Sequence, residues 1–154
     1  MADIPGIAPG SPASPSSPPS LVLRVDGGSR GNPGPAAYGV VVCDDAGSVI
    51  QTLRASVGIQ TNNFAEYSGL LAALRYALQQ KARKVTVYAD SQLLVRQMQG
   101  RYAVKSPNLR PLFEEARRLA ASIPDFSIHH VYREANREAD RLANQAMDER
   151  NRPA

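Results

Sequence analysis

The sequence predicts an α/β protein with a five-stranded mixed sheet and helices on both faces. Two observations predict it. Three apolar runs of strand length follow one another near the N-terminal end, and beyond them segments with helical spacing alternate with two further strand-like runs. The expected order is therefore three strands, a helix, a strand, two helices, a strand and a helix. Strands that a helix separates run parallel in such an arrangement.

The first three strands are expected at residues 21–27, 36–45 and 48–58. The first is the near-continuous apolar run LVLRVDG, the second is AAYGVVVCDD, and the third, SVIQTLRASVG, alternates roughly between apolar and polar residues. Because the connections between them are tight, these strands are expected to form an antiparallel meander.

The longest helix is expected at residues 61–80, where leucines recur at helical spacing. Its start contains Asn63 followed three residues later by Glu66, as in a capping box. Pro107 is expected near the start of a later helix. The remaining elements are expected, in order, at 84–90 (strand), 91–100 (helix), 106–122 (helix), 125–134 (strand) and from Asn136 onward (amphipathic helix).

Residues 1–20 differ in composition from the rest of the chain. They consist mainly of Pro, Ser, Gly and Ala, which cannot bury a core. We therefore expect a disordered leader at 1–20, a single domain at 21–150 and a disordered tail at 151–154. A chain of 154 residues is long enough to bury a core without disulfides or a structural metal.

Cysteine usage and charge bear on the setting of the protein. The single cysteine, Cys43, lies in an apolar run and has no second cysteine to pair with, which predicts a buried thiol in a reducing cytoplasm. No apolar run approaches the ~18 residues of a membrane span, and the N-terminus lacks the pattern of a signal peptide. The net charge of +4 favours an anionic partner such as nucleic acid.

Four acidic residues border predicted apolar structure. Asp26 and Asp90 are expected to end the first and fourth strands. Glu66 is expected in the first turn of the longest helix, and Asp140 near the start of the last. Sites in such sheets lie at the carboxyl ends of the parallel strands. Each acid also has a local explanation, since Glu66 and Asp140 would gain from a helix dipole and Asp90 could cap a helix.

Together, four carboxylates at one end of the sheet would repel one another unless cations neutralise them. Carboxylate oxygens suit hard cations, and the sequence has no Cys/His cluster with zinc spacing, so Mg²⁺ or Mn²⁺ is expected. Two such ions could flank a scissile phosphate.

The motifs around these acids resemble those of ribonuclease H type I. The stretch DGGSRGNPGPAAYG at 26–39 resembles the family's first-strand acid and the loop after it. TNNFAEYSGLLAAL at 61–74 resembles its TNN helix start, YADSQLL at 88–94 its DSQ segment, and NREADRLAN at 136–144 its closing helix. The resemblance extends from Leu21 to about Glu149 and implies the ribonuclease H-like fold.

The resemblance also implies an activity and a set of site residues. It implies hydrolysis of the RNA strand of an RNA/DNA hybrid with two Mg²⁺ ions, or Mn²⁺ as a substitute, leaving 3′-hydroxyl and 5′-phosphate ends. The four acids would be both catalytic and metal-binding. Side-chain amides in the matching motifs would line the minor groove of the hybrid, although turn and cap chemistry explains Asn62 and Asn63 equally well. The substrate-binding residues implied are Gly27, Gly28, Asn32, Asn62, Asn63, Ser91, Gln92 and Arg133.

The sequence departs from the family in two places. Many members carry a histidine in a glycine-rich loop before the closing helix, but His129 and His130 fall in the predicted fifth strand, and the short loop offers Arg133 instead. We expect Arg133 to contact phosphate or product in its place. The lysine-rich insertion of many bacterial members is reduced to RYAVKS at 101–106, which predicts weaker hybrid affinity and a strong salt dependence.

Alternatives to this function remain. A catalytically silent hybrid-binding module on the same fold predicts the loss of at least one of the four acids, and all four are present. A short loop resembles that of archaeal and actinobacterial members, some of which also cut double-stranded RNA, so a relaxed nuclease is the other alternative. The expected partners are the hybrid and, under this alternative, double-stranded RNA; the protein is expected to be a monomer without membrane contact.

Overall fold

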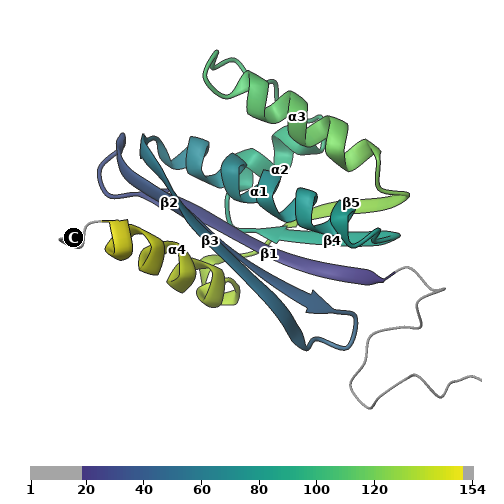
Figure 1. Cartoon of the computed structure of the whole chain (residues 1–154). Coiled ribbons are helices and arrows are strands. Elements are labelled where there is room, and N and C mark those ends of the chain that lie inside the picture. The colour runs from purple at the N-terminus through teal and green to yellow at the C-terminus, as the bar shows by residue number, and fades with distance from the viewer. Residues whose placement is uncertain (1–18, 151–154) are drawn as a thin grey trace, which may run out of the picture.

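The computed structural model describes residues 19–150 and confirms a five-stranded mixed sheet with helices on both faces (Figure 1). The order across the sheet is β3-β2-β1-β4-β5. The first three strands pair antiparallel, and β1, β4 and β5 pair parallel. The strands are β1 (Ser20–Ser29), β2 (Gly34–Asp44), β3 (Val49–Gln60), β4 (Lys84–Ala89) and β5 (Asp125–His130).

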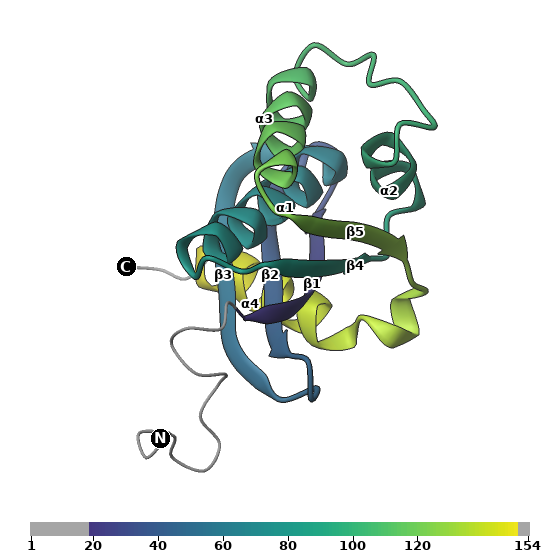
Figure 2. The ribbon, with the colours of Figure 1, turned by 90° about the vertical axis from the view of Figure 1, so that its right-hand side faces the viewer.

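The helices divide between the two faces of the sheet. In Figure 1, α1 and α3 lie on one side of the sheet and α4 lies on the other. In Figure 2 the chain leaves the carboxyl ends of β4 and β5 on the same side of the molecule, toward α2 and α4 respectively. The helices are α1 (Asn62–Gln79), α2 (Gln92–Met98), α3 (Arg110–Ala121), the 3₁₀ helix η1 (Arg133–Ala135) and α4 (Arg137–Arg150).

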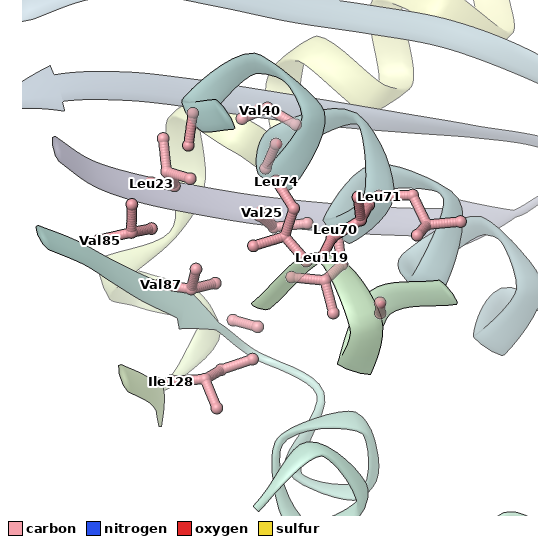
Figure 3. Close-up of a cluster of buried hydrophobic side chains, with 14 of the residues drawn as sticks. Leu23, Val25, Val40, Leu70, Leu71, Leu74, Val85, Val87, Leu119 and Ile128 are labelled. Carbon is pink, nitrogen blue, oxygen red and sulfur yellow. The ribbon is translucent and has the colours of Figure 1, made fainter. Parts of the chain in front are cut away.

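The main core lies between the sheet and the helices α1 and α3 (Figure 3). Alternate residues of β1, such as Leu23 and Val25, point into it because side chains in a strand alternate between faces. Leu70 and Leu74 of α1 belong to the same cluster and lie close to Val25. A smaller cluster under α4 includes Cys43, which confirms the predicted buried thiol.

Three predicted boundaries were wrong. Thr61 caps α1 by accepting a hydrogen bond from the backbone N–H of Phe64 (3.2 Å), so Asn63 and Glu66 form no capping box and Glu66 lies beyond the first turn. The fifth strand ends at His130 rather than at residue 134, because the chain turns there toward η1. Pro107 precedes α3, whose first turn contains a different proline.

The end of β1 also differs from the expectation. Asp26 does not end the strand, because β1 continues to Ser29 in its antiparallel pairing with β2. The parallel ladder between β1 and β4 does stop, however, at the pair Val25 and Ala89. The two strands therefore separate just before Asp26 and Asp90.

Most of the predicted leader lies outside the described residues, as does the predicted tail at 151–154. Of the leader's residues, Ser20 already belongs to β1. Within residues 19–150, no helix is both long enough and apolar enough to cross a membrane.

Candidate active site

Carboxylates from three elements converge where β1 and β4 separate. Asp26 of β1, Glu66 of α1 and Asp90, which follows β4, each offer an oxygen, and these oxygens lie within 4.8 Å of one another. Asp140, in the first turn of α4, lies close enough to Asp26 to influence its pKa and lines the same cavity. The structure thus brings all four predicted acids together.

Glu66 can reach this cluster because Gly27 has no side chain. A Cβ at Gly27 would lie 2.5 to 2.6 Å from backbone atoms of Ala65 and Glu66, so only glycine lets α1 approach the backbone of β1 this closely. The resemblance implied Gly27 as a substrate-binding residue, and the structure shows that its missing side chain leaves room for α1. At Gly28 the nearest atom to an added Cβ is Oδ1 of Asn62, 3.8 Å away, so this glycine borders open space.

A second glycine brings α4 to the opposite face of the sheet. A Cβ at Gly39 of β2 would overlap the carbonyl oxygen of Ala139, which precedes Asp140. The bare backbone at Gly39 therefore lets the first turn of α4 approach the sheet and carry Asp140 toward Asp26.

Burial and like charge raise the pKa of two of these acids. Asp26 is only 8% exposed, and burial, followed by the charge of Asp90 and by contact with Asp140, raises its pKa to about 9. Burial and then the charge of Asp90 raise the pKa of Glu66 to about 8, although Ser91 and Arg133 act in the opposite direction. Without a bound cation, burial and like charge therefore disfavour the ionised form of both carboxyl groups near neutral pH.

A hard divalent cation fits this donor set. One carboxylate oxygen, Oδ2 of Asp90, is buried and has no hydrogen-bond partner among the residues the structure describes. A buried polar atom without a partner is unfavourable unless something binds to it. The converging groups offer only carboxylate oxygens, which magnesium and similar ions prefer.

A cavity of about 640 Å³ opens over the carboxylates. Besides the four acids, the predicted residues that line it are Gly27, Gly28, Asn62, Asn63, Ser91 and Arg133. Two further predicted residues, Asn32 and Gln92, do not line it. Gln92 is exposed at the start of α2.

The asparagine side chains partly stabilise the protein itself. Oδ1 of Asn32 accepts a hydrogen bond from the backbone N–H of Asn62 (3.0 Å), and Oδ1 of Asn62 accepts one from the backbone N–H of Ser29 (2.7 Å). These bonds join the end of β1 and the loop after it to the start of α1; they are tertiary contacts rather than the local turn and cap bonds of the alternative explanation. The side-chain nitrogens of Asn32 and Asn62 have no acceptor within residues 19–150.

The cavity also contains residues that the sequence did not single out. Arg30 and Asn144 line it, and an Arg30 Nη2 group lies 3.4 Å from the side-chain and backbone oxygens of Asn144. Arg30 also pairs with Asp148 at 2.7 Å. These contacts exist because α4 packs beside the loop after β1, and no local motif signals such a tertiary contact.

A family model described as reverse transcriptase-like matches residues 24–146. Over 129 residues the chain is 46% identical to the bifunctional protein Rv2228c of Mycobacterium tuberculosis. The match covers 83% of this chain and 35% of that protein. Over 124 residues it is 42% identical to ribonuclease HI of Halobacterium salinarum, covering 80% of this chain and 62% of that protein. The chain thus spans about a third of the mycobacterial relative's length and under two thirds of the archaeal one's.

Solved structures agree with this fold. The N-terminal RNase H domain of Rv2228c, solved as a fusion with maltose binding protein, has a TM-score of 0.82 at 45% identity and covers 85% of this chain and 95% of that one. RNase H1 from Halobacterium salinarum has a TM-score of 0.81 at 40% identity, and the match covers 84% of this chain and 98% of that one. LC11-RNase H1, isolated from compost and solved in complex with an RNA/DNA hybrid, has a TM-score of 0.80 at 40% identity, covering 85% and 99%.

Proposed function

Because the chain belongs to the ribonuclease H family, we propose that it is an endoribonuclease that hydrolyses the RNA strand of RNA/DNA hybrids, leaving 3′-hydroxyl and 5′-phosphate ends. The convergence of four carboxylates in one cavity carries this proposal. A catalytically silent hybrid-binding module would have no need to keep four mutually repelling acids together.

We assign the four carboxylates, Asp26, Glu66, Asp90 and Asp140, to two Mg²⁺ ions, with Mn²⁺ as a substitute. The raised pKa values of Asp26 and Glu66 support this assignment, because they indicate a site that lacks its counter-charge. When bound, the ions supply the positive charge and Lewis acidity that phosphodiester hydrolysis requires. Asp26 and Glu66 would hold the ions as ionised carboxylates, so cation binding would favour loss of their protons.

The cavity and the loop next to it supply groups suited to a hybrid. The side-chain nitrogens of Asn32 and Asn62 are available to donate to ribose 2′-hydroxyls and base edges, which are the features that distinguish RNA from DNA in the minor groove. Asn63 and Gly28 line the cavity beside them, and the hydroxyl of Ser91 already caps α2 at its edge. Gln92, outside the cavity, is assigned to the same groove farther along the substrate.

Arg133 takes the place of the loop histidine that the chain lacks. It is exposed, lines the cavity, and lies close enough to Glu66 to lower the pKa of that acid. A guanidinium group in this position binds a backbone phosphate of substrate or product. The short loop around Arg133 also favours a second candidate activity, the cutting of double-stranded RNA.

We assign the activity to residues 21–150 acting as a monomer. The buried thiol of Cys43 suits the reducing cytoplasm in which we place the protein. Because only residues 101–106 remain of the family's lysine-rich insertion, we expect hybrid binding to depend mainly on the cavity and the residues around it.

An end-labelled cleavage assay tests the proposed function. The wild type and Asp26→Asn are incubated with an RNA/DNA hybrid, matched double-stranded RNA and double-stranded DNA, in Mg²⁺, Mn²⁺ or EDTA. We expect cleavage of the RNA strand of the hybrid that EDTA and the substitution both abolish. Folded wild type that binds the hybrid without cutting it in either metal would support the silent binder, and comparable cutting of double-stranded RNA would establish the relaxed nuclease.

A further inference from the structure

Asn136 is the most deeply buried polar residue in the described part of the chain, at 1% exposure. It lies between η1 and α4 and is neither one of the four acids nor part of the cavity lining. Its side-chain nitrogen donates a hydrogen bond of 2.8 Å to the carbonyl oxygen of Val25, a residue 111 positions away. This bond is buried and joins the start of α4 to β1.

The two ends of this contact flank the carboxylate site. Val25 belongs to the last register pair between β1 and β4, and the next residue along its strand is Asp26. On the other side, the carbonyl oxygen of Asn136 accepts a hydrogen bond of 3.1 Å from the backbone N–H of Asp140. One residue therefore contacts the strand that carries Asp26 through its side chain, and the helix turn that carries Asp140 through its backbone.

Stability alone does not explain an asparagine here. The side-chain oxygen of Asn136 is buried and has no hydrogen-bond partner within residues 19–150. Burying such an atom is unfavourable, and an apolar residue of similar shape would avoid that penalty. What an apolar residue would lose is the bond to Val25.

A second, more exposed contact links the same parts. Nη1 of Arg24, two residues before Asp26, donates to the carbonyl oxygen of Ala135 (3.0 Å), the residue before Asn136. The Arg24 guanidinium also lies over the ring of Tyr88, 5.0 Å from its centroid. The junction of η1 and α4 is thus attached to β1 at two adjacent positions, of which only the Asn136 bond is shielded from water.

We propose that Asn136 is a positioning residue of the carboxylate site. Its amide holds the start of α4 against β1 and so sets the distance between Asp140 and Asp26. This proposal rests on the proposed function of the site. It also explains the residue type, because the amide donates a proton without adding a charge, whereas an ionised aspartate would have no proton to donate and would add a further negative charge beside the four acids.

The test compares Asn136→Leu with Gln97→Met as a matched control. Gln97 of α2 is the other deeply buried amide, at 5% exposure; its side chain accepts from the hydroxyl of Tyr67 (2.7 Å) and donates to the carbonyl oxygen of Ala103 (3.4 Å), so neither of these hydrogen bonds is made to α4. Both variants remove a buried hydrogen bond, so both should lower the free energy of unfolding. Only Asn136→Leu should lower kcat on the hybrid. We expect a loss of about ten- to a hundredfold, which is typical of a misplaced catalytic group, while KM stays within twofold of the wild-type value.

Two further measurements do not depend on activity. Hydrogen exchange in the first turn of α4, read at the amide of Asp140, should be faster in Asn136→Leu and unchanged in Gln97→Met. Calorimetry should show weaker Mg²⁺ binding in Asn136→Leu alone. If the wild type cleaves no hybrid, the proposed function fails, while these two measurements still test the positioning role.

Arg24→Gln covers the case in which Asn136→Leu does not fold. It removes the exposed bond to Ala135 and leaves the core intact, so it should lower kcat less than Asn136→Leu and increase exchange in the same helix turn. The proposal is overturned if Asn136→Leu keeps the kcat, the hydrogen-exchange rate at Asp140 and the Mg²⁺ affinity of the wild type. It is also overturned if Gln97→Met, at equal stability, loses as much kcat, exchange protection and Mg²⁺ affinity as Asn136→Leu does. If Asn136→Leu does not fold, the proposal is overturned when Arg24→Gln folds and keeps the kcat and the exchange rate of the wild type.

Discussion

Asp26 combines deep burial with neighbouring like charges, and both raise the pKa of its carboxyl group from 3.8 to about 9. In the metal-free protein the folded state therefore keeps a proton that the unfolded state releases. Stability must then fall as the pH rises from about 4 toward 9, because the unfolded state binds fewer protons over that range. Glu66 contributes in the same direction up to about pH 8.

Asp26→Asn should consequently stabilise the metal-free protein while abolishing cleavage. The amide keeps the shape of the carboxyl group and has no proton to lose, so we expect a gain of about 2 kcal/mol near neutral pH, typical of relieving an unfavourable buried group. Urea unfolding in EDTA at pH 5 and pH 8 measures this. The wild type should lose more stability than the variant between the two pH values, and parallel behaviour of the two proteins would argue against a raised pKa at Asp26.

Arg133→Ala should weaken hybrid binding by the same factor whatever the base sequence of the hybrid. If the guanidinium contacts one phosphate, its removal should raise KM several-fold and reduce the slope of log affinity against log salt by about 1. Binding measured between low and moderate salt tests this, with Arg133→Lys as the matched variant that keeps the charge. An unchanged salt slope in Arg133→Ala would exclude a phosphate contact.

Among the elements, α1 depends on Gly27 for its close approach to the backbone of β1. Gly27→Ala would push α1 away from β1 and move Glu66 relative to Asp26, because the new Cβ would overlap backbone atoms that cannot move separately. We expect a loss of about 1–3 kcal/mol in unfolding free energy, typical of overpacking, together with a large loss of kcat. Gly28→Ala is the matched control for stability, since its Cβ has room. Equal stability of the two variants would contradict this description of the contact.

Local pattern explains which elements could be predicted. Apolar periodicity identified all five strands and the four α-helices. Asp26, Glu66 and Asp140 were placed on the right elements, and Asp90 lies one residue beyond the strand that it was expected to end. The capping of α1 by Thr61 was missed because Asn63 offered an equally good local pattern. The extension of β1 past Asp26 was missed because glycines there suggested a loop, whereas pairing with β2 keeps them in the strand. The roles of Arg30 and Asn136 come from packing of α4 on β1 and its loop, and only the assembled structure contains those contacts.

For the molecule as a whole, the site exists only when both faces of the sheet are covered. In Figure 1, α1, which carries Glu66, and α4, which carries Asp140, lie on opposite sides of the sheet, and the strands supply the acids between them. Cation binding and folding are therefore linked. Mg²⁺ at a hundred times its dissociation constant should stabilise the wild type by about 2.7 kcal/mol. Thermal unfolding should show this rise in the wild type and little or none in Asp26→Asn; an equal rise in both would place the bound ion elsewhere.

The most direct measurement is a calorimetric titration of Mg²⁺ into the metal-free protein at pH 7, in two buffers of different ionisation enthalpy. The difference between the two heats counts the protons released on binding. We predict net proton release from the wild type, because Asp26 and Glu66 must lose protons to hold the ions, and weaker binding with less proton release from Asp26→Asn. Absence of Mg²⁺ binding, or equal binding by Asp26→Asn, would contradict the assignment of this cluster as the metal-binding site. Binding without proton release would contradict the raised pKa values of Asp26 and Glu66.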